Sequence, residues 1–452
     1  MSMSPSASAP LEPSVEVLDV IGVGFGPSNL ALAIALAEHN LGGRKLTARF
    51  IERQERFGWH RGMLIEDATM QVSFLKDLVT PRNPESPFTF LSYLHSRDRL
   101  SDFINYGSVY PSRLEFHDYL EWAAAKFADQ VDYGSEVVAI RPVRRADGLV
   151  EHVEIQARDA LGDVTTHRAR NVVLATGLTP HLPAGVTPGE RIWHSHDLLR
   201  LAPKLIGTGP ERAVVVGAGQ SAAEVLGYLH TALPDTEVCA VFARYGYSPA
   251  DDSSFANRIF DPVAVDEFYT APDAVKARLL DYHANTNYSV VDPELIDALY
   301  RRHYHERVAG RERLRFLNMT RVTEVAQVGD RVELAVESLV DGSVEVINTD
   351  LVVYATGYRS SDPDALLGDF GVSWDRDAAG RLRIRRDYRV ATAPEVLAGV
   401  YLQGPTEHTH GISSSLLSNV AVRTGEIVAS ISAAAVDQDR QPVGRPTAPA
   451  AR

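Results

Sequence analysis

Apolar and polar positions alternate along this chain in two repeating blocks. The run VEVLDVIGVG at 15–24 predicts a buried strand that ends in a tight turn, an apolar helix pattern follows at 29–39, and KLTARFIER at 45–53 predicts a second strand. The block returns at 212–245, where RAVVVGAGQSAAEVLGYLH and EVCAVFARY predict strand, turn, helix and strand. A strand, a helix and a strand of this length form a βαβ unit, so the pattern predicts an α/β fold with two such units.

Each predicted unit carries glycines between its first strand and its helix. We expect Gly22 and Gly217 to allow the tight turn, and Gly24 and Gly219 to let a pyrophosphate approach the backbone at the helix N-terminus. Pro27 stands where a dinucleotide fingerprint has its third glycine. Proline is tolerated in the first helical turn, so the loop remains compatible with a dinucleotide. The two loops therefore predict two dinucleotide-binding (Rossmann-like) domains.

The second strand of each unit ends in a different charge. Glu52 is placed to accept hydrogen bonds from a ribose hydroxyl pair, which suits FAD or NAD, whereas Arg244 suits the 2′-phosphate of NADPH. The alternative for Arg244 is a solvated charge at a strand end. Two further apolar strands, 171–177 and 350–358, end in Ala-Thr-Gly and are predicted to lead the chain between the two domains. The alternative is two ordinary buried strands that end in glycine.

Composition narrows the class of protein. The chain has 452 residues, enough for two or three domains, and its net charge of −14 argues against a nucleic-acid partner. Cys239 is the single cysteine, which excludes internal disulfides and a CxxC redox pair and is typical of a reducing cytoplasm. No apolar run approaches the ~20 residues that span a bilayer, so we expect no membrane partner. Ser-, Pro- and Ala-rich ends predict disordered tails at 1–14 and 433–452.

The order GxGxxP, ATG, GxGxSAxE and ATGY resembles class B flavin-dependent monooxygenases. Four longer segments, at 57–94, 251–262, 285–292 and 408–419, are similar to the microbial lysine/ornithine N-monooxygenases of siderophore biosynthesis, and the resemblance covers about 15–432. It implies an FAD-binding domain at 15–200 and 357–432, and an NADPH-binding domain at 201–356. A small, mainly helical substrate-pocket excursion at 246–315 interrupts the second domain. Homo-tetramers are usual in this family.

The resemblance also implies the chemistry. NADPH reduces FAD, O2 adds to give a C4a-hydroperoxide, and a neutral side-chain amine attacks the distal oxygen. Lysine-specific members tend to have FLADLVT where this chain has FLKDLVT at 74–80, so the resemblance favours L-ornithine N5-hydroxylation for a hydroxamate siderophore or a related natural product. No side chain is assigned the chemical step, because the cofactor carries the oxygen chemistry.

Matching positions give three sets of candidate residues. The substrate set comprises Lys76, Asn257, Asn287, Ser413 and Ser415. The FAD set comprises Gly22, Gly24, Pro27, Glu52, Trp59, His60, Met70, Gln71 and Arg113. The NADPH set comprises Gly217, Gly219, Gln220, Ser221 and Arg244. Structural alternatives are a surface lysine at 76, turn asparagines, helix-capping serines, and core positions for Trp59 and Met70.

Three other functions remain open at this stage. The first is L-lysine N6-hydroxylation. The second is a class B monooxygenase acting on a ketone or thioether, although GERIWHS at 189–195 matches the FxGxxxH fingerprint imperfectly. The third is a redox-sensing protein that binds flavin or NADPH without catalysis. Three histidine pairs, at 194–196, 303–305 and 408–410, lack further ligands at familiar spacing, so we expect no metal.

Overall fold

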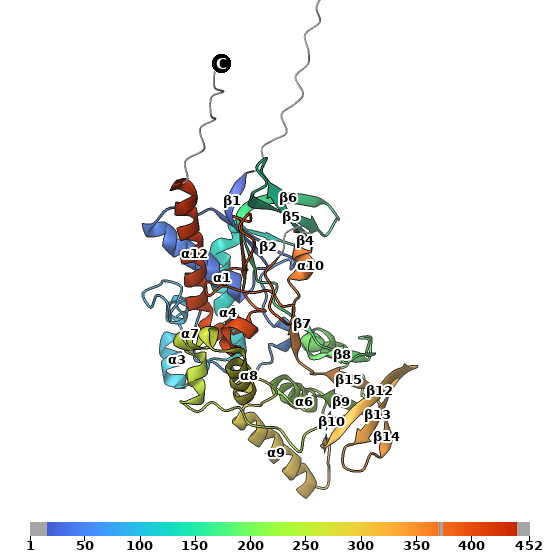
Figure 1. Cartoon of the computed structure of the whole chain (residues 1–452). Helices are drawn as coiled ribbons and strands as arrows, with labels where there is room; N and C mark the ends of the chain where they lie inside the picture. Colours follow the sequence, from blue (N-terminus) through green and yellow to red (C-terminus); the bar gives the residue numbers. More distant parts are fainter. Residues whose placement is uncertain (1–15, 369, 371–373, 441–452) are drawn as a thin grey trace, which may run out of the picture.

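The computed structural model describes residues 16–368, 370 and 374–440. The tail predicted at 1–14 and the part of the C-terminal tail from 441 lie outside the described residues. Figure 1 shows two α/β bodies, one above the other, each built around its own sheet. The predicted α/β class with two βαβ units is therefore confirmed. We call the body around the seven-stranded sheet the first body, and the body around the five-stranded sheet the second.

The sheet of the first body is mainly parallel. Its strands are β1 (Val17–Val23), β2 (Ala48–Glu52), β3 (Val131–Tyr133), β4 (Ser135–Arg144), β5 (Val150–Asp159), β6 (Val164–Leu174) and β17 (Gly399–Leu402). Their order is β3-β2-β1-β6-β5-β4, with β17 pairing in parallel with β6. The pairs β4–β5 and β5–β6 are antiparallel, and the other described pairs of this sheet are parallel. Because β17 comes late in the chain, two separate segments build this body.

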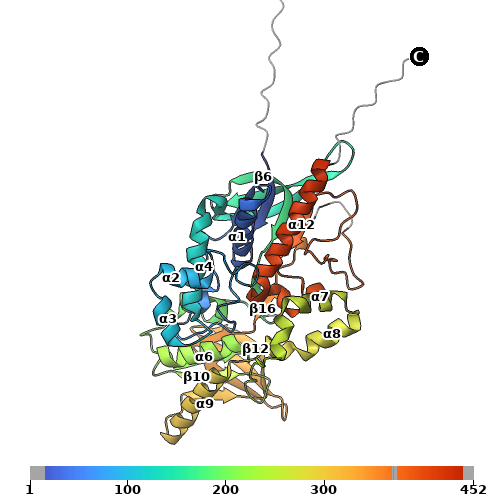
Figure 2. The ribbon, with the colours of Figure 1, turned by 90° about the vertical axis from the view of Figure 1, so that its left-hand side faces the viewer.

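Helices cover the first sheet. They are α1 (Pro27–Gly42), α2 (Phe90–Ser96), α3 (Leu100–Tyr106), α4 (Arg113–Ala124), α10 (Asp364–Leu367) and α12 (Val420–Arg440). Figure 2 shows α1 and α12 side by side, and the two helices are in contact. Leu30 and Ile34 of α1, Phe50 and Val173 of the sheet and Ile427 of α12 share one buried core.

The C-terminal helix differs from the expectation. The tail was predicted to begin at 433, but α12 continues through Arg440. Residues 433–435 are three alanines, the strongest helix former, and Ala435 is buried. The Ala-rich composition that reads as a low-complexity tail is therefore also the composition of a helix end.

The second body is a parallel sheet with an antiparallel sheet packed on it. Its parallel strands are β8 (Ile192–His194), β9 (Arg212–Val216), β10 (Glu237–Val241), β11 (Leu314–Leu317) and β15 (Leu351–Tyr354), in the order β11-β10-β9-β15-β8. The antiparallel strands are β12 (Thr320–Val328), β13 (Arg331–Ser338) and β14 (Val344–Thr349). Helices α5 (Leu198–Leu201) and α6 (Gln220–Ala232) belong to this body. Since β8 lies here and Trp193 is in its core, the chain enters the second body before residue 200, the boundary that was expected.

The two connections between the bodies lie side by side. Ala-Thr-Gly follows β6 and β15, and the next residues form β7 (Leu178–Pro180) and β16 (Tyr358–Ser360), which pair antiparallel. The two signatures thus lead the chain out of the first body and back into it, at one crossing point.

A helical segment between β10 and β11 bridges the bodies. It contains α7 (Pro262–Thr270), α8 (Asp273–Tyr282), α9 (Pro293–Val308) and the short 3-10 turns η5 (Ala256–Phe260) and η6 (Ala284–Thr286). Helix α9 contacts α6, whereas α7 contacts α11 (Glu407–His410) of the first body. The helical segment therefore contacts the second body through α9 and the first body through α7.

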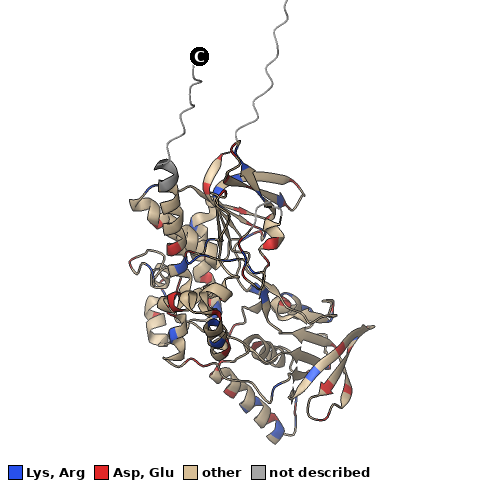
Figure 3. Ribbon diagram, viewed as in Figure 1, with Lys and Arg blue, Asp and Glu red and all other residues tan. Residues whose placement is uncertain are grey.

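Charges of both signs are interspersed over both bodies (Figure 3). Across the described ranges, no helix combines the length and the apolarity that a membrane crossing requires. The same residues contain no group of three or more His, Cys, Asp or Glu side chains arranged to hold a metal ion.

Candidate active site

The two glycine turns have the same local structure. Gly24 and Gly217 both have positive φ, at 83° and 141°. A Cβ on Gly24 would lie 2.5 Å from the carbonyl oxygen of Ala175, and a Cβ on Gly217 would lie 2.4 Å from that of Ala355. These alanines open the two Ala-Thr-Gly signatures. Each signature therefore passes directly beneath a turn that only glycine can form.

This equivalence corrects the predicted register of the first loop. Gly22 lies inside β1, where a Cβ would meet the Phe50 ring at 2.3 Å, so the prediction that Gly22 forms the turn is wrong. Helix α1 is N-capped by Gly26, as α6 is by Gly219. The fingerprints are thus Gly24-x-Gly26-x-x-Asn29 and Gly217-x-Gly219-x-x-Ala222. Pro27 occupies the first helical turn, as predicted, and Asn29 takes the third position.

Both turns fit the diphosphate of a dinucleotide. A Cβ on Gly26 would meet nothing within 4 Å, and one on Gly219 would meet only Ser289, at 3.5 Å. Neither helix has a side-chain cap at its N-terminus, so its first N–H groups are free to bind an anion. Gln220 and Ser221 open α6, as Pro27 and Ser28 open α1.

Glu52 ends β2 and braces the first loop. Its side chain is 6% exposed, and its two carboxylate oxygens accept hydrogen bonds from the backbone N–H groups of Phe25, at 2.6 Å, and Gln54, at 2.8 Å. Phe25 lies between the two glycines of the turn. The carboxylate is therefore held at the strand end beside the loop, where its contact with a ribose stays a prediction.

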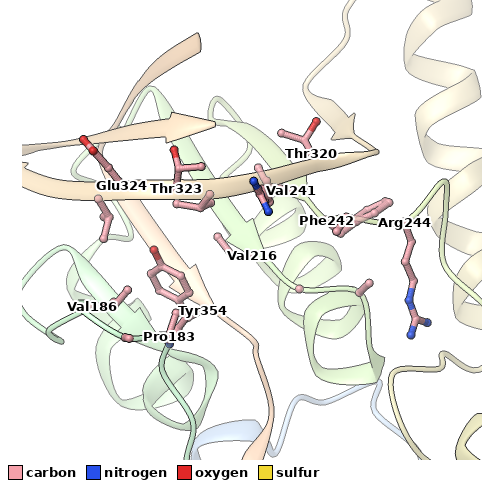
Figure 4. Close-up of a pocket in the computed structure, with 18 of the residues that line it drawn as sticks. Pro183, Val186, Val216, Val241, Phe242, Arg244, Thr320, Thr323, Glu324 and Tyr354 are labelled. Carbon is pink, nitrogen blue, oxygen red and sulfur yellow. The ribbon is translucent and has the colours of Figure 1, made fainter. Parts of the chain in front are cut away.

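A cavity of about 670 Å³ opens beside the second glycine turn (Figure 4). Its walls come from the ends of β9 and β10, from β12, from Tyr354 and from residues 183–186. Arg244 lines this cavity, and its Nη1 donates to the carbonyl oxygen of Ser289 at 2.7 Å. Arg321 of β12 also lines it. Sequence reasoning missed Arg321 because β12 belongs to the added antiparallel sheet, outside the βαβ unit.

An ion pair joins the two bodies. Arg113, at the start of α4, donates from Nη1 and Nη2 to the carboxylate of Glu224 in α6, at 2.9 and 2.7 Å, and from Nη1 to the carbonyl oxygen of Met63 at 2.9 Å. Gln220 donates to the same carboxylate at 2.9 Å. The position of Arg113 in the flavin pocket stays a prediction, and the structure shows that its guanidinium group also contacts the second body. Glu224 was not singled out, although it is the last letter of the GxGxSAxE motif.

Aromatic and imidazole rings gather next to this pair. His60, with a left-handed φ of 49°, contacts the rings of Trp59 and Tyr358. Burial, together with the charge of Arg113, lowers the pKa of His60 to about 4, so its ring is neutral at physiological pH. Met70 is 6% exposed, and Gln71 is exposed.

Lys76 belongs to the first body, and its side chain lies next to the helical segment between β10 and β11. Its Nζ is 5.8 Å from the centroid of the Phe260 ring in η5, and it forms no ion pair with any carboxylate in the part of the chain that is described. The next residue, Asp77, is 2% exposed and accepts hydrogen bonds from the backbone N–H groups of Val79, Thr80 and Phe90. Asp77 therefore orders the loop from which Lys76 projects.

The other substrate candidates lie around the same segment. Asn257 is in η5, which contacts the 3-10 turn η7 (Ile412–Ser415) that carries Ser413 and Ser415. Ser413 is 2% exposed, and Ser415 is half-buried. The structure thus brings Lys76, Asn257 and the two serines to adjoining elements.

Asn287 directly follows η6 of the helical segment. Its neighbour Tyr288 donates from its hydroxyl group to a carboxylate oxygen of Glu407 in α11, at 2.9 Å. Burial raises the pKa of Glu407. Tyr288 was missed because it is one letter inside the matched segment 285–292, and Glu407 because it lies one residue before the matched segment 408–419. Their hydrogen bond ties the helical segment to α11, just before η7.

Comparison with known proteins agrees with this arrangement. Residues 16–360 match the family model for L-lysine 6-monooxygenase/L-ornithine 5-monooxygenase. The chain is 41% identical to an L-ornithine N(5)-monooxygenase of Burkholderia cepacia, over 87% of this chain and 90% of that protein. It is similar to the solved ornithine N-hydroxylase of Kutzneria sp. 744, described with reduced FAD, NADP+ and L-orn. The TM-score is 0.88 with 48% identity, over 92% of this chain and 99% of that one.

A second solved structure, the ornithine hydroxylase of Pseudomonas aeruginosa, gives a TM-score of 0.87 with 37% identity and covers 93% of this chain and 100% of that one. The matches extend over both glycine turns, both Ala-Thr-Gly crossings and the helical segment between the bodies. The chain therefore belongs to the L-lysine 6-monooxygenase/L-ornithine 5-monooxygenase family, and it is a flavin-dependent monooxygenase.

Proposed function

We propose that this enzyme hydroxylates N5 of L-ornithine, with FAD as its resident cofactor, NADPH as the reductant and O2 as the source of the oxygen atom. The observation that carries the choice of substrate is Lys76. It is a lysine without a carboxylate partner in the described chain, on a loop ordered by Asp77, and it faces η5 of the helical segment. A cation so placed is suited to bind the α-carboxylate of a free amino acid.

The two glycine turns divide the cofactors between the bodies. In the first body, the turn at Gly24 and Gly26 and the N-terminus of α1 would hold the FAD diphosphate, with Glu52 at the ribose. In the second body, the turn at Gly217 and Gly219 would hold the NADPH diphosphate, with Arg244 at the 2′-phosphate. When bound there, FAD would supply the oxygen-transfer chemistry, with NADPH as the reductant and O2 as the source of the oxygen atom.

The role of the protein residues in this proposal is to place the amine. Lys76 fixes the carboxylate end of the amino acid, and the amides of Asn257 and Asn287 hold its polar atoms. The length of the side chain then sets where the terminal nitrogen lies. L-Lysine is one methylene longer than L-ornithine, and a misplacement of about 1 Å costs on the order of a hundredfold in rate.

The product, N5-hydroxy-L-ornithine, is a building block for a hydroxamate siderophore or a related natural product. We further propose a homo-tetramer in the cytoplasm. Family resemblance supports the assembly, and the single cysteine supports the compartment. Light scattering on the purified enzyme and cell fractionation test the two statements.

Replacing Lys76 tests the substrate assignment. Lys76→Ala should raise the KM for L-ornithine by at least about tenfold, because a charge-assisted hydrogen bond contributes roughly 1.5–3 kcal/mol. Flavin reduction by NADPH should stay near the wild-type rate. Lys126→Ala is the matched control, since the Nζ of Lys126 also lies 5.8 Å from an aromatic ring, that of Trp122, but Lys126 is exposed, in the 3-10 turn Ala125–Gln130 that follows α4. An unchanged KM in Lys76→Ala would remove the carboxylate role.

A further inference from the structure

Arg423 of α12 is one of the largest fully buried side chains of the protein, with 1% of its surface exposed. Its Nε donates to Oε1 of Gln403 at 3.2 Å, its Nη2 donates to Oγ of Ser28 at 3.3 Å, and its Nη1 donates to the carbonyl oxygen of Ser414. All three acceptors are neutral. A guanidinium group is thus held in the interior of the first body by groups that carry no negative charge.

No carboxylate neutralises this guanidinium among the described residues. Glu426 lies three positions further along α12, but both of its oxygens accept hydrogen bonds from Arg386, at 2.7 and 2.9 Å. Burial lowers the pKa of Arg423, which reflects the cost of keeping its charge away from water. A buried, unpaired cation is strongly destabilising unless an anion compensates it.

The hydrogen bonds of Arg423 lead to the first glycine turn. Ser28 is the second residue of α1, directly after Pro27. Gln403 donates from Nε2 to the carbonyl oxygen of Ser28 at 3.2 Å and to Oδ1 of Asn29 at 3.0 Å. The amide nitrogen of Asn29 donates to the carbonyl oxygen of Gly24 at 2.7 Å.

This network also explains why the third fingerprint position holds Asn29 rather than glycine. Asn29 is fully buried, and its amide links Gly24 of the turn to Gln403. The positive charge of Arg423 therefore sits directly behind the N-terminus of α1. A helix N-terminus already favours an anion, so two features of one site favour the same charge.

We propose that Arg423 is the buried countercharge of the FAD diphosphate, and that it positions the first glycine turn through Ser28 and Gln403. The inference rests on the FAD site of the proposed function. Arg423 is a positioning residue, because its three contacts are with protein groups. The bound diphosphate compensates its charge across the first turn of α1, so FAD binding and the stability of the first body are coupled.

Arg423→Met tests this role, because methionine keeps much of the length and removes the charge. FAD is titrated into the FAD-depleted, full-length enzyme, with binding followed by flavin fluorescence and stability by urea unfolding. We expect about tenfold to hundredfold weaker FAD binding, the range for loss of a charged interaction. The FAD-depleted protein should be as stable as wild type or more stable, because an unpaired buried charge has been replaced by an apolar group.

Two control variants separate charge from packing. Arg423→Lys keeps the positive charge, so its FAD affinity should stay within about threefold of the wild-type value. Thr424→Val changes the adjacent buried position of α12, whose hydroxyl bonds only within the helix, and should leave FAD affinity unchanged. Wild-type FAD affinity in Arg423→Met, or the same loss of stability with and without FAD, would overturn the proposal.

Ligand fragments identify the part of FAD that Arg423 serves. Arg423→Met should weaken ADP binding to the FAD-depleted enzyme and leave adenosine binding unchanged, and an equal loss for both refutes a diphosphate role. If Arg423→Met does not fold, the double variant Ser28→Ala with Gln403→Leu removes both hydrogen-bonded links from Arg423 to α1, and unchanged FAD affinity in that variant refutes the proposal. Failure of L-ornithine hydroxylation with normal FAD binding would contradict the proposed substrate and leave this inference standing.

Discussion

Glu224→Gln should weaken the attachment of the two bodies of the enzyme to each other. The carboxylate accepts two hydrogen bonds from Arg113 of the first body, at 2.9 and 2.7 Å, while only 13% of the Arg113 side chain and 5% of the Glu224 side chain are exposed. Glutamine keeps the shape of the side chain but removes the negative charge. Arg113 then retains the Met63 carbonyl oxygen as its neutral acceptor and loses its ion-pair partner.

The expected loss in the free energy of unfolding follows from the burial of the Arg113–Glu224 pair. Two unit charges about 4 Å apart interact by about 4 kcal/mol at an effective dielectric constant of about 20. Removing one partner of a buried pair costs roughly 3–5 kcal/mol, because the other charge is left uncompensated. Glutamine still offers one acceptor to Arg113, so we expect a loss of about 3 kcal/mol in the free energy of unfolding.

A double-mutant cycle with Arg113→Met measures the pair itself. Urea unfolding of the FAD-saturated single and double variants should give a coupling energy of about 2–3 kcal/mol. Rapid mixing with NADPH under anaerobic conditions should show flavin reduction slowed by about tenfold in Glu224→Gln, since a small misplacement of the second body lengthens the transfer distance. Additive losses, with a coupling energy below about 0.5 kcal/mol, would refute the claim that this pair joins the bodies.

Three further predictions concern the cofactor, the substrate amine and a buried histidine. Arg244→Ala should weaken NADPH binding much more than NADH binding, with the exposed Arg315→Ala of β11 as control, and equal losses would remove the 2′-phosphate role. Hydroxylated product, quantified apart from NADPH oxidation, should rise from about pH 6 towards about pH 9, because the reacting amine must be neutral; a flat yield contradicts this. His60 has a pKa lowered from 6.5 to about 4, so the unfolded chain binds its proton first and stability is lost as the pH falls through that window. His60→Gln should flatten this loss, which is at most about 1.4 kcal/mol per pH unit for one group, and an unchanged unfolding profile would contradict the assignment.

Local sequence patterns were enough to predict the βαβ units and the crossing segments, because strand and helix periodicity is a property of neighbouring residues. The glycine register failed at GVGFG, which contains two overlapping G-x-G pairs. The approach of Gly24 to the carbonyl oxygen of Ala175 decides between them, and that contact joins distant parts of the chain.

The charged networks were beyond sequence reasoning for the same physical reason. Arg113 and Glu224 are 111 positions apart, and Ser28 and Arg423 are 395 positions apart, so no spacing rule relates them. Family motifs give a residue's neighbourhood and not its partner, so the partner of Arg113 was not predicted. Arg423 drew no notice, because an arginine in a helix is ordinarily a solvated surface charge.

The most direct test of the substrate assignment is a competition under isotopically heavy O2. The enzyme is given FAD, NADPH and equal amounts of L-ornithine and L-lysine, and the products are identified by mass spectrometry beside the NADPH consumed. We expect one heavy oxygen atom on N5 of ornithine, in an amount close to the NADPH oxidised, and little hydroxylated lysine. Preferential hydroxylation of lysine, or NADPH oxidation that yields only hydrogen peroxide with ornithine, would contradict an L-ornithine N5-monooxygenase.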